Sequence, residues 1–168
     1  MPGLLTPDSN ILVLPYLARK GVRPTHIIEF LFSTVERLEK MTGSPVPVGF
    51  EKAMLEKVTK WILRQEMKRR NKFISTRSLS WEGDKIERIE VRLEPRYTNN
   101  SIYHGDNMGD LEHELVRFPS GTTDDIIDAL QGLVQILQNP KDAKKAEKET
   151  DEFAWWREQA INVKKAVK

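Results

Sequence analysis

The segment from Phe118 to Leu130 has the sequence FPSGTTDDIIDAL and places three aspartates within five positions, Asp124 to Asp128. From Ile126 onward the apolar residues recur with helical spacing, which predicts a helix from about Asp124 to Leu137. Asn139-Pro140 follows and is typical of a helix end. The purpose of so many carboxylates at the start of an apolar helix is the first question that the sequence raises.

One interpretation of these acids is structural. Thr122 or Thr123 would cap the helix, and Asp124 and Asp125 would occupy the first turn, where acidic side chains interact favourably with the helix dipole. This interpretation accounts for an isolated Thr-Thr-Asp-Asp sequence without any functional role.

The other interpretation is a metal site. Asp128 lies one turn beyond Asp125, so the two side chains are expected on one helix face, which continues to the small residues Ala129 and Gly132. A face without bulk leaves room for close approach, and hard oxygen ligands at this spacing suit Mg²⁺ or Mn²⁺.

A metal site needs a further acid, and Glu51 is the candidate. It follows the strand-like sequence VPVGF and precedes a predicted helix, and strand ends are where α/β folds build their sites. On spacing alone, a first-turn helix acid explains Glu51 slightly better than a metal ligand does. The metal interpretation therefore depends on Glu51 and the last helix together.

The remaining elements alternate between strands and helices, which predicts an α/β fold. Pro15 places the first long strand near an edge or a bend. Glu94-Pro95 is expected to end the helix that begins at about residue 85. The expected elements are a strand at 11–14 after a turn at 7–10, a helix from Pro24, a strand ending near Glu51, a helix at 52–72 with Met54, Leu55, Val58, Ile62 and Met67 on its apolar face, a strand at 73–79, a helix at 85–95, an edge strand at 102–104 and a short helix around Leu111 and Leu115.

Composition sets bounds on the function. The 168 residues, 39% of them hydrophobic, suit one globular domain, and 27 basic against 25 acidic residues give a net charge of +2. No cysteine is present, no apolar run approaches the ~20 residues that span a bilayer, and no nucleotide-binding glycine loop occurs. We expect a protein of the cytoplasm with no membrane contact, whose residues 139–168 form a charged helical tail.

Basic residues gather in the middle of the chain. They are usually a solvated helix face, but only Glu66 interrupts the run up to Lys72, so contact with DNA phosphates is a second interpretation. Trp61 and Trp81 flank the run and are expected to pack in the core. The candidate DNA-binding residues are Arg64, Lys68, Arg69, Arg70, Lys85 and Arg88.

Taken together, these motifs resemble the nuclease domain of phage terminase large subunits, over roughly Asn10 to Leu137. The resemblance rests on the order and spacing of four stretches. They are Val48-Gly-Phe-Glu51-Lys, Lys85-x-x-Arg88-Ile with Leu93-x-Pro95, Leu111-x-x-Glu114-Leu115, and Phe118-Pro-x-Gly-x-x-Asp124-Asp125-x-x-Asp128-Ala-Leu.

The resemblance implies an RNase H-like mixed sheet flanked by helices, which spans residues 1–138 and cleaves double-stranded DNA with two Mg²⁺ or Mn²⁺ ions during genome packaging. It implies that Glu51, Asp125 and Asp128 are catalytic, and that these three and Asp124 bind metal. The Asp-x-x-Asp-Ala-Leu form is also similar to Holliday-junction resolvases of the same fold. By the same resemblance, the partners are the terminase ATPase portion, the small terminase subunit and the portal, in the cytoplasm of an infected host.

This chain departs from the family pattern at its start. The first catalytic aspartate of the family lies on a first, central strand that precedes the residues present here, so we expect an N-terminally truncated domain, and Asp8 does not take that role. The rival hypothesis is a non-catalytic α/β module, or dead nuclease fragment, that binds DNA or protein.

Overall fold

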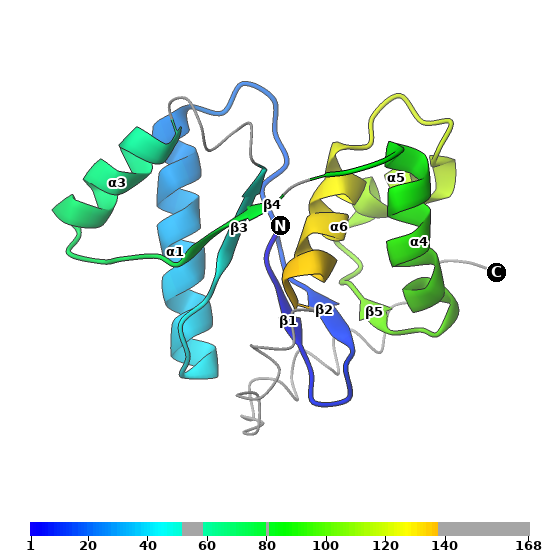
Figure 1. The fold of residues 1–168 in the computed structure, drawn as a ribbon, viewed down its shortest axis with the longest axis horizontal. Helices are drawn as coiled ribbons and strands as arrows, with labels where there is room; N and C mark the ends of the chain where they lie inside the picture. Colours follow the sequence, from blue (N-terminus) through cyan, green and yellow to red (C-terminus); the bar gives the residue numbers. More distant parts are fainter. Residues whose placement is uncertain (52–58, 80, 138–168) are drawn as a thin grey trace. The chain divides into compact units, whose positions relative to one another are not determined.

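The computed structural model describes residues 1–51, 59–79 and 81–137. The described residues fall into two compact units (Figure 1). Unit 1 combines Met1–Tyr16 with the described residues from Gly83 onward, and unit 2 is Leu17–Glu82. The expected helical tail at 139–168, and the expected apolar positions Met54, Leu55 and Val58, lie outside the described residues.

Unit 1 contains a three-stranded sheet of order β1-β2-β5. Strand β1 (Gly3–Leu5) is antiparallel to β2 (Ile11–Val13), which is parallel to β5 (Ile102–Tyr103). The expected edge position is confirmed for β5 but is wrong for β2, which is the middle strand. Strand β2 ends at Val13, so Pro15 lies beyond the hydrogen-bonded ladder and disturbs nothing.

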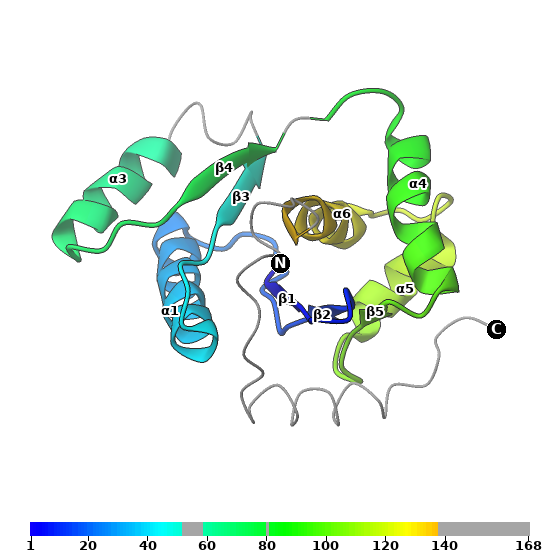
Figure 2. The ribbon, with the colours of Figure 1, turned by 60° about the horizontal axis from the view of Figure 1, so that its bottom comes forward.

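The described part of unit 1 also contains the helices α4 (Lys85–Thr98), α5 (Gly109–Arg117) and α6 (Asp125–Leu137). Helix α6 lies over the sheet and contacts β1, α4 and α5 (Figure 2). Its apolar stripe and those of its neighbours form one core, whose most buried members are Ile11, Val13, Ile89, Leu93, Met108, Leu111, Ile127, Leu130 and Val134.

Helix α4 begins as a capped helix and runs further than the sequence predicts. The Asp84 side chain accepts hydrogen bonds from the N–H groups of Ile86 and Glu87, which satisfies two donors of the first turn. The expected end at Pro95 is wrong, because the helix continues to Thr98. A proline removes only its own N–H, and the Pro95 carbonyl still accepts a hydrogen bond from Asn99 N–H at 3.0 Å.

The described residues of unit 2 form two helices and a two-stranded parallel sheet. Its elements in chain order are α1 (Pro24–Thr42), β3 (Val48–Glu51), α3 (Thr59–Arg69) and β4 (Thr76–Leu79). Helix α1 starts with proline at its N-terminus and ends at Gly43, whose φ of 63° is the left-handed conformation that glycine adopts readily. The core of unit 2 is formed by Ile28, Phe32, Val35, Leu63, Met67 and Ile74.

The described helices and strands thus confirm a mixed α/β fold with small sheets. Among the described residues, none of the helices combines the length and the apolar character needed to cross a bilayer.

The close approach of α6 to β1 gives a stability prediction. A Cβ atom at Gly3 would lie 2.5 Å from Leu133 Cδ2 and 2.9 Å from the Leu12 carbonyl oxygen. We expect Gly3→Ala to lower the free energy of unfolding by about 1–3 kcal/mol, as overpacking does. Gly109→Ala is the matched control, since nothing lies within 4 Å of its added Cβ. Urea denaturation of both variants checks this, and equal stabilities would contradict the packing of α6 on β1.

Candidate functional site

The acids of α6 meet a lysine of α4. Lys85 Nζ lies 2.8 Å from Asp124 Oδ1 and 2.8 Å from Asp128 Oδ2, so two carboxylates share one ammonium. Asp124 immediately precedes α6, and its carbonyl accepts the N–H of Asp128 at 2.9 Å. Because the two acids are four residues apart, both project from the same side of the helix toward α4.

A second cation and a buried amide extend this cluster. Arg88 Nη2 lies 3.3 Å from Asp128 Oδ1, and Arg88 Nε donates to Gln131 Oε1 at 3.1 Å. Gln131 is fully buried, and its amide donates in turn to the Arg88 carbonyl at 3.3 Å. The Arg88 guanidinium therefore binds Asp128 directly, and the Gln131 amide holds Arg88 in place. We call Lys85, Arg88, Asp124, Asp128 and Gln131 the acid–base cluster.

The two carboxylates hold the Lys85 ammonium in its ionised form. Burial lowers the pKa of Lys85, but hydrogen bonds to Asp124 and Asp128 act against it and leave the pKa above its ordinary value. The lysine thus stays protonated at neutral pH. The two carboxylate oxygens converge on a single cation, which is the arrangement that a small hard cation would also require.

Glu114 of α5 provides the N-terminal cap of α6. Its carboxylate is buried and accepts the N–H groups of Ile126 and Ile127 at 2.9 and 3.1 Å. The cap expected from Thr122 or Thr123 is therefore supplied by Glu114 instead. Because a residue of another helix satisfies these donors, the side chains of Asp124 and Asp128 are available to bind Lys85.

The two other candidate metal ligands, Asp125 and Glu51, are exposed. Asp125, which the spacing pairs with Asp128, is exposed in the first turn of α6, and the shared cation pairs Asp128 with Asp124. Glu51 is the exposed last residue of β3 in unit 2. Within residues 1–51, 59–79 and 81–137, no three His, Cys, Asp or Glu side chains gather closely enough to hold a metal ion.

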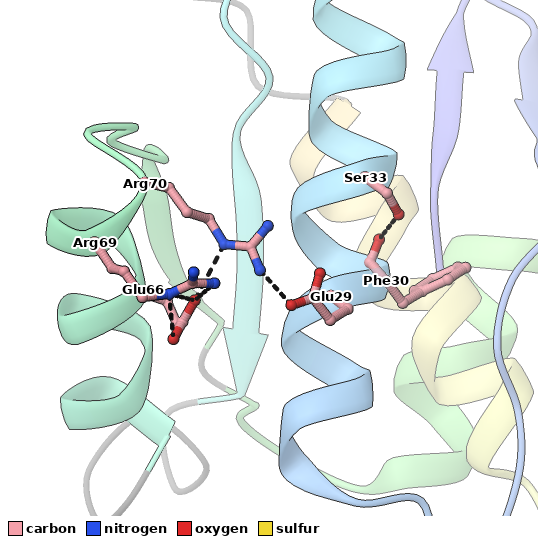
Figure 3. A network of polar contacts seen from close by, with 6 residues as sticks. All are labelled: Glu29, Phe30, Ser33, Glu66, Arg69 and Arg70. Carbon is pink, nitrogen blue, oxygen red and sulfur yellow. Dashed lines mark hydrogen bonds and ion pairs between the residues drawn. The ribbon is translucent and has the colours of Figure 1, made fainter.

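Half of the basic residues predicted on α3 are bound to acids. Arg69 donates to both oxygens of Glu66, with Nη2 at 2.8 Å, and Arg70 Nε donates to the same carboxylate at 3.1 Å (Figure 3). Arg70 also pairs with Glu29 of α1 and lies 4.6 Å from the centroid of the Phe32 ring. Arg70 thus joins α3 to α1. The acids near this helix are less sparse than the sequence indicates, since α1 contributes one of them.

The other two basic residues of α3 face solvent. Arg64 and Lys68 are exposed, and within the described part of the chain neither has an acidic partner. Trp61 precedes them on the same helix and is 66% exposed. The expectation that Trp61 packs in the core is therefore wrong, because the core face of α3 is supplied by Leu63 and Met67.

Unit 1 contains a buried histidine directly after strand β5. His104 follows β5 and is almost fully buried, and its Nδ1 is 3.8 Å from Glu112 Oε1, too far for a hydrogen bond. Burial lowers the pKa of His104, against the opposing charges of Glu112 and Asp106. The residue is consequently neutral at physiological pH and belongs to the packing of unit 1.

Comparison of the chain with protein-family models, with curated proteins and with solved structures finds no match. Sequence reasoning missed two residues of this region, Glu114 and Gln131. A signal for Gln131 was present, since two amides, Gln131 and Gln135, interrupt the apolar sequence of the last helix and a buried amide requires hydrogen-bond partners.

The cap of α6 gives a second stability prediction. We expect Glu114→Ala to lower the free energy of unfolding by about 1–3 kcal/mol, because two N–H groups in the protein interior lose their acceptor. Glu114→Gln keeps one acceptor oxygen and is expected to cost less. Thr122→Ala and Thr123→Ala are the controls and should each cost under about 0.5 kcal/mol. A larger loss in the threonine variants, measured by urea denaturation, would assign the cap to them.

The environment of His104 predicts a pH dependence of stability. With its folded-state pKa below the unfolded value of about 6.5, the unfolded chain binds the proton more readily. Stability is therefore full above pH 6.5 and falls as pH decreases toward the folded-state pKa, with a slope of up to about 1.4 kcal/mol per pH unit. His104→Asn should reduce the slope between pH 7 and 5.5, and exposed His113→Asn should leave it unchanged. Equal slopes in denaturation series would contradict this.

Proposed function

We propose that this chain is part of a metal-dependent nuclease of the RNase H-like class, as in the nuclease domain of phage terminase large subunits. The observation that carries the proposal is the convergence of Asp124 Oδ1 and Asp128 Oδ2 on one cation, each at 2.8 Å from Lys85 Nζ. Two carboxylate oxygens already arranged around a positive centre are the start of a divalent-metal site.

The position of the sequence motifs supports the same proposal. Lys85 and Arg88 belong to one stretch of the terminase resemblance and Asp128 to another, 40 residues beyond Arg88. Both stretches meet at the acid–base cluster. Motifs that are distant in sequence and adjacent in the fold are expected at an active site, although a structural contact between two helices produces the same pattern.

Asp124 and Asp128 would supply two of the oxygen ligands that Mg²⁺ or Mn²⁺ needs, and Asp125 lies beside them in the first turn of α6. The terminase resemblance implies Glu51 as a further ligand. When bound, the two metal ions of such a site activate a water and stabilise the leaving oxygen of a phosphodiester. The chain itself supplies ligand orientation, because Arg88 and Gln131 fix Asp128. Lys85 holds the two carboxylates together, and a divalent ion bound there would have to displace its ammonium.

The proposed substrate is double-stranded DNA in the cytoplasm of an infected host. The middle strand of the described sheet, β2, is Ile-Leu-Val and carries no acid. The first catalytic aspartate of the family would then come from another segment. The terminase ATPase portion, the small terminase subunit and the portal are the partners that the proposal implies.

A second candidate function is a non-catalytic module that binds DNA or protein. The observation that favours it is the neutralisation of the same acids, because Lys85 and Arg88 together balance Asp124 and Asp128. A closed network of this kind joins α4 to α6 without any metal, as structural ion pairs do.

Titration with Mn²⁺ separates the two functions. For the nuclease, we expect saturable binding in the calorimeter that Glu51→Ala, Asp125→Asn and Asp128→Asn each weaken by about tenfold or more. Lys85→Met should bind Mn²⁺ more tightly than the parent, because it removes the competing ammonium. Asp8→Asn, at an exposed aspartate outside the cluster, is the matched control.

The rival outcome is equally definite. A folded parent chain that shows no saturable Mn²⁺ binding, in which Lys85→Met lowers stability and confers no metal affinity, identifies the acid–base cluster as a structural network. In that case the non-catalytic module is the correct function. Circular dichroism of each variant establishes that it is folded before titration.

A further inference from the structure

One face of α3 carries an exposed tryptophan between exposed polar and basic residues. Trp61, Arg64, Gln65 and Lys68 follow the spacing i, i+3, i+4, i+7, which places them on a single side of the helix. All four are exposed, and Trp61 is exposed by 66%. We call these four residues the Trp61 face.

The opposite side of α3 accounts for the rest of the helix. Leu63 and Met67 pack into the core of unit 2, and Arg70 is bound to Glu66 and Glu29. Glu66 is the single acid in the sequence of α3, and its carboxylate is occupied by Arg69 and Arg70 (Figure 3). The cations of the Trp61 face therefore have no carboxylate on their own helix to neutralise them, whereas those on the opposite side do.

An exposed indole is costly to leave in water, and among the described residues of unit 2 nothing in the packing requires one at this position. An apolar partner surface would be matched by apolar neighbours, but the neighbours of Trp61 along the face are two cations and an amide. A partner that offers anions and flat aromatic groups in alternation matches this composition, and a nucleic acid with unpaired bases is the polymer that does so.

We propose that the Trp61 face binds single-stranded nucleic acid, with Trp61 stacking on an unpaired base and with Arg64 and Lys68 contacting phosphates. A base inside a duplex has no free face, so stacking requires an unpaired segment. This inference goes beyond the proposed function, and for the class of partner it rests on the DNA-binding role that the sequence predicts for Arg64 and Lys68. It does not require metal binding or cleavage.

The test uses the full chain in EDTA, so that its result is independent of any metal site. Fluorescence anisotropy measures binding of a labelled oligothymidylate and of a labelled duplex of the same length. We expect Trp61→Ala to weaken binding of the single strand roughly tenfold and to leave the duplex nearly unaffected. Trp61→Phe keeps an aromatic surface and should restore most of the affinity.

The basic residues are tested by salt dependence with a matched charge control. Each of Arg64→Gln and Lys68→Gln should lower the slope of log affinity against log salt by about 0.7, the value for one phosphate contact with a single strand. Arg69→Gln removes the same charge from the same helix, but Arg69 is bound to Glu66, so the slope should change less. Phe73→Ala, at an aromatic residue 73% exposed outside the Trp61 face, is the aromatic control.

Three outcomes would overturn the inference. They are single-strand binding unchanged in Trp61→Ala, an equal loss in the Arg69 or Phe73 controls, and no binding of the single strand by the parent chain. A dimer that Trp61→Ala converts to a monomer in sedimentation would instead assign the Trp61 face to self-association. Failure of the Mn²⁺ titration with success here would reject the nuclease and retain nucleic-acid binding.

Discussion

The arrangement of unit 1 depends on the two hydrogen bonds that the Glu114 carboxylate accepts from the start of α6. Glu114 is an acid of α5, buried among apolar side chains, and it is stable there because two N–H groups of α6 donate to it. These bonds fix where α6 begins relative to α5. The start of α6 in turn sets the position of Asp124 and Asp128, and so places them against Lys85 and Arg88 of α4.

The acid–base cluster is specific without being strongly stabilising. Lys85, Asp124 and Asp128 are all partly exposed, and ion pairs of this kind typically contribute about 0.2–1 kcal/mol each. Arg88 is largely buried, and losing its partners would leave a charge in the interior at a much greater cost. The cluster therefore selects one rotation of α6 against α4, while the apolar core supplies most of the free energy. A cation site at its exposed end could change occupants without disturbing that core.

Local pattern predicted most elements, because apolar periodicity records which side of a helix or strand is buried. The pattern predicts helix α4 but not its end, because Pro95 removes a single N–H and does not stop the helix. The cap by Glu114 and the pairing of Lys85 with Asp128 join residues far apart in the chain, and no local pattern specifies such partners. The exposure of Trp61 was missed for a different reason: a tryptophan is usually buried, and only the completed core of unit 2 shows that its place is already filled.

The division of the chain also has a consequence for its synthesis on the ribosome. Strands β1 and β2 emerge before unit 2, but an isolated pair of strands is marginally stable, and their partners α4, β5 and α6 follow only after the whole of unit 2. At about 5–20 residues per second, this delay amounts to several seconds or more. Unit 2 draws its core from one continuous segment and can close during that interval. Unit 1 is completed only after unit 2, so a nascent β1–β2 pair, with its backbone edges open, depends on chaperone protection during that interval.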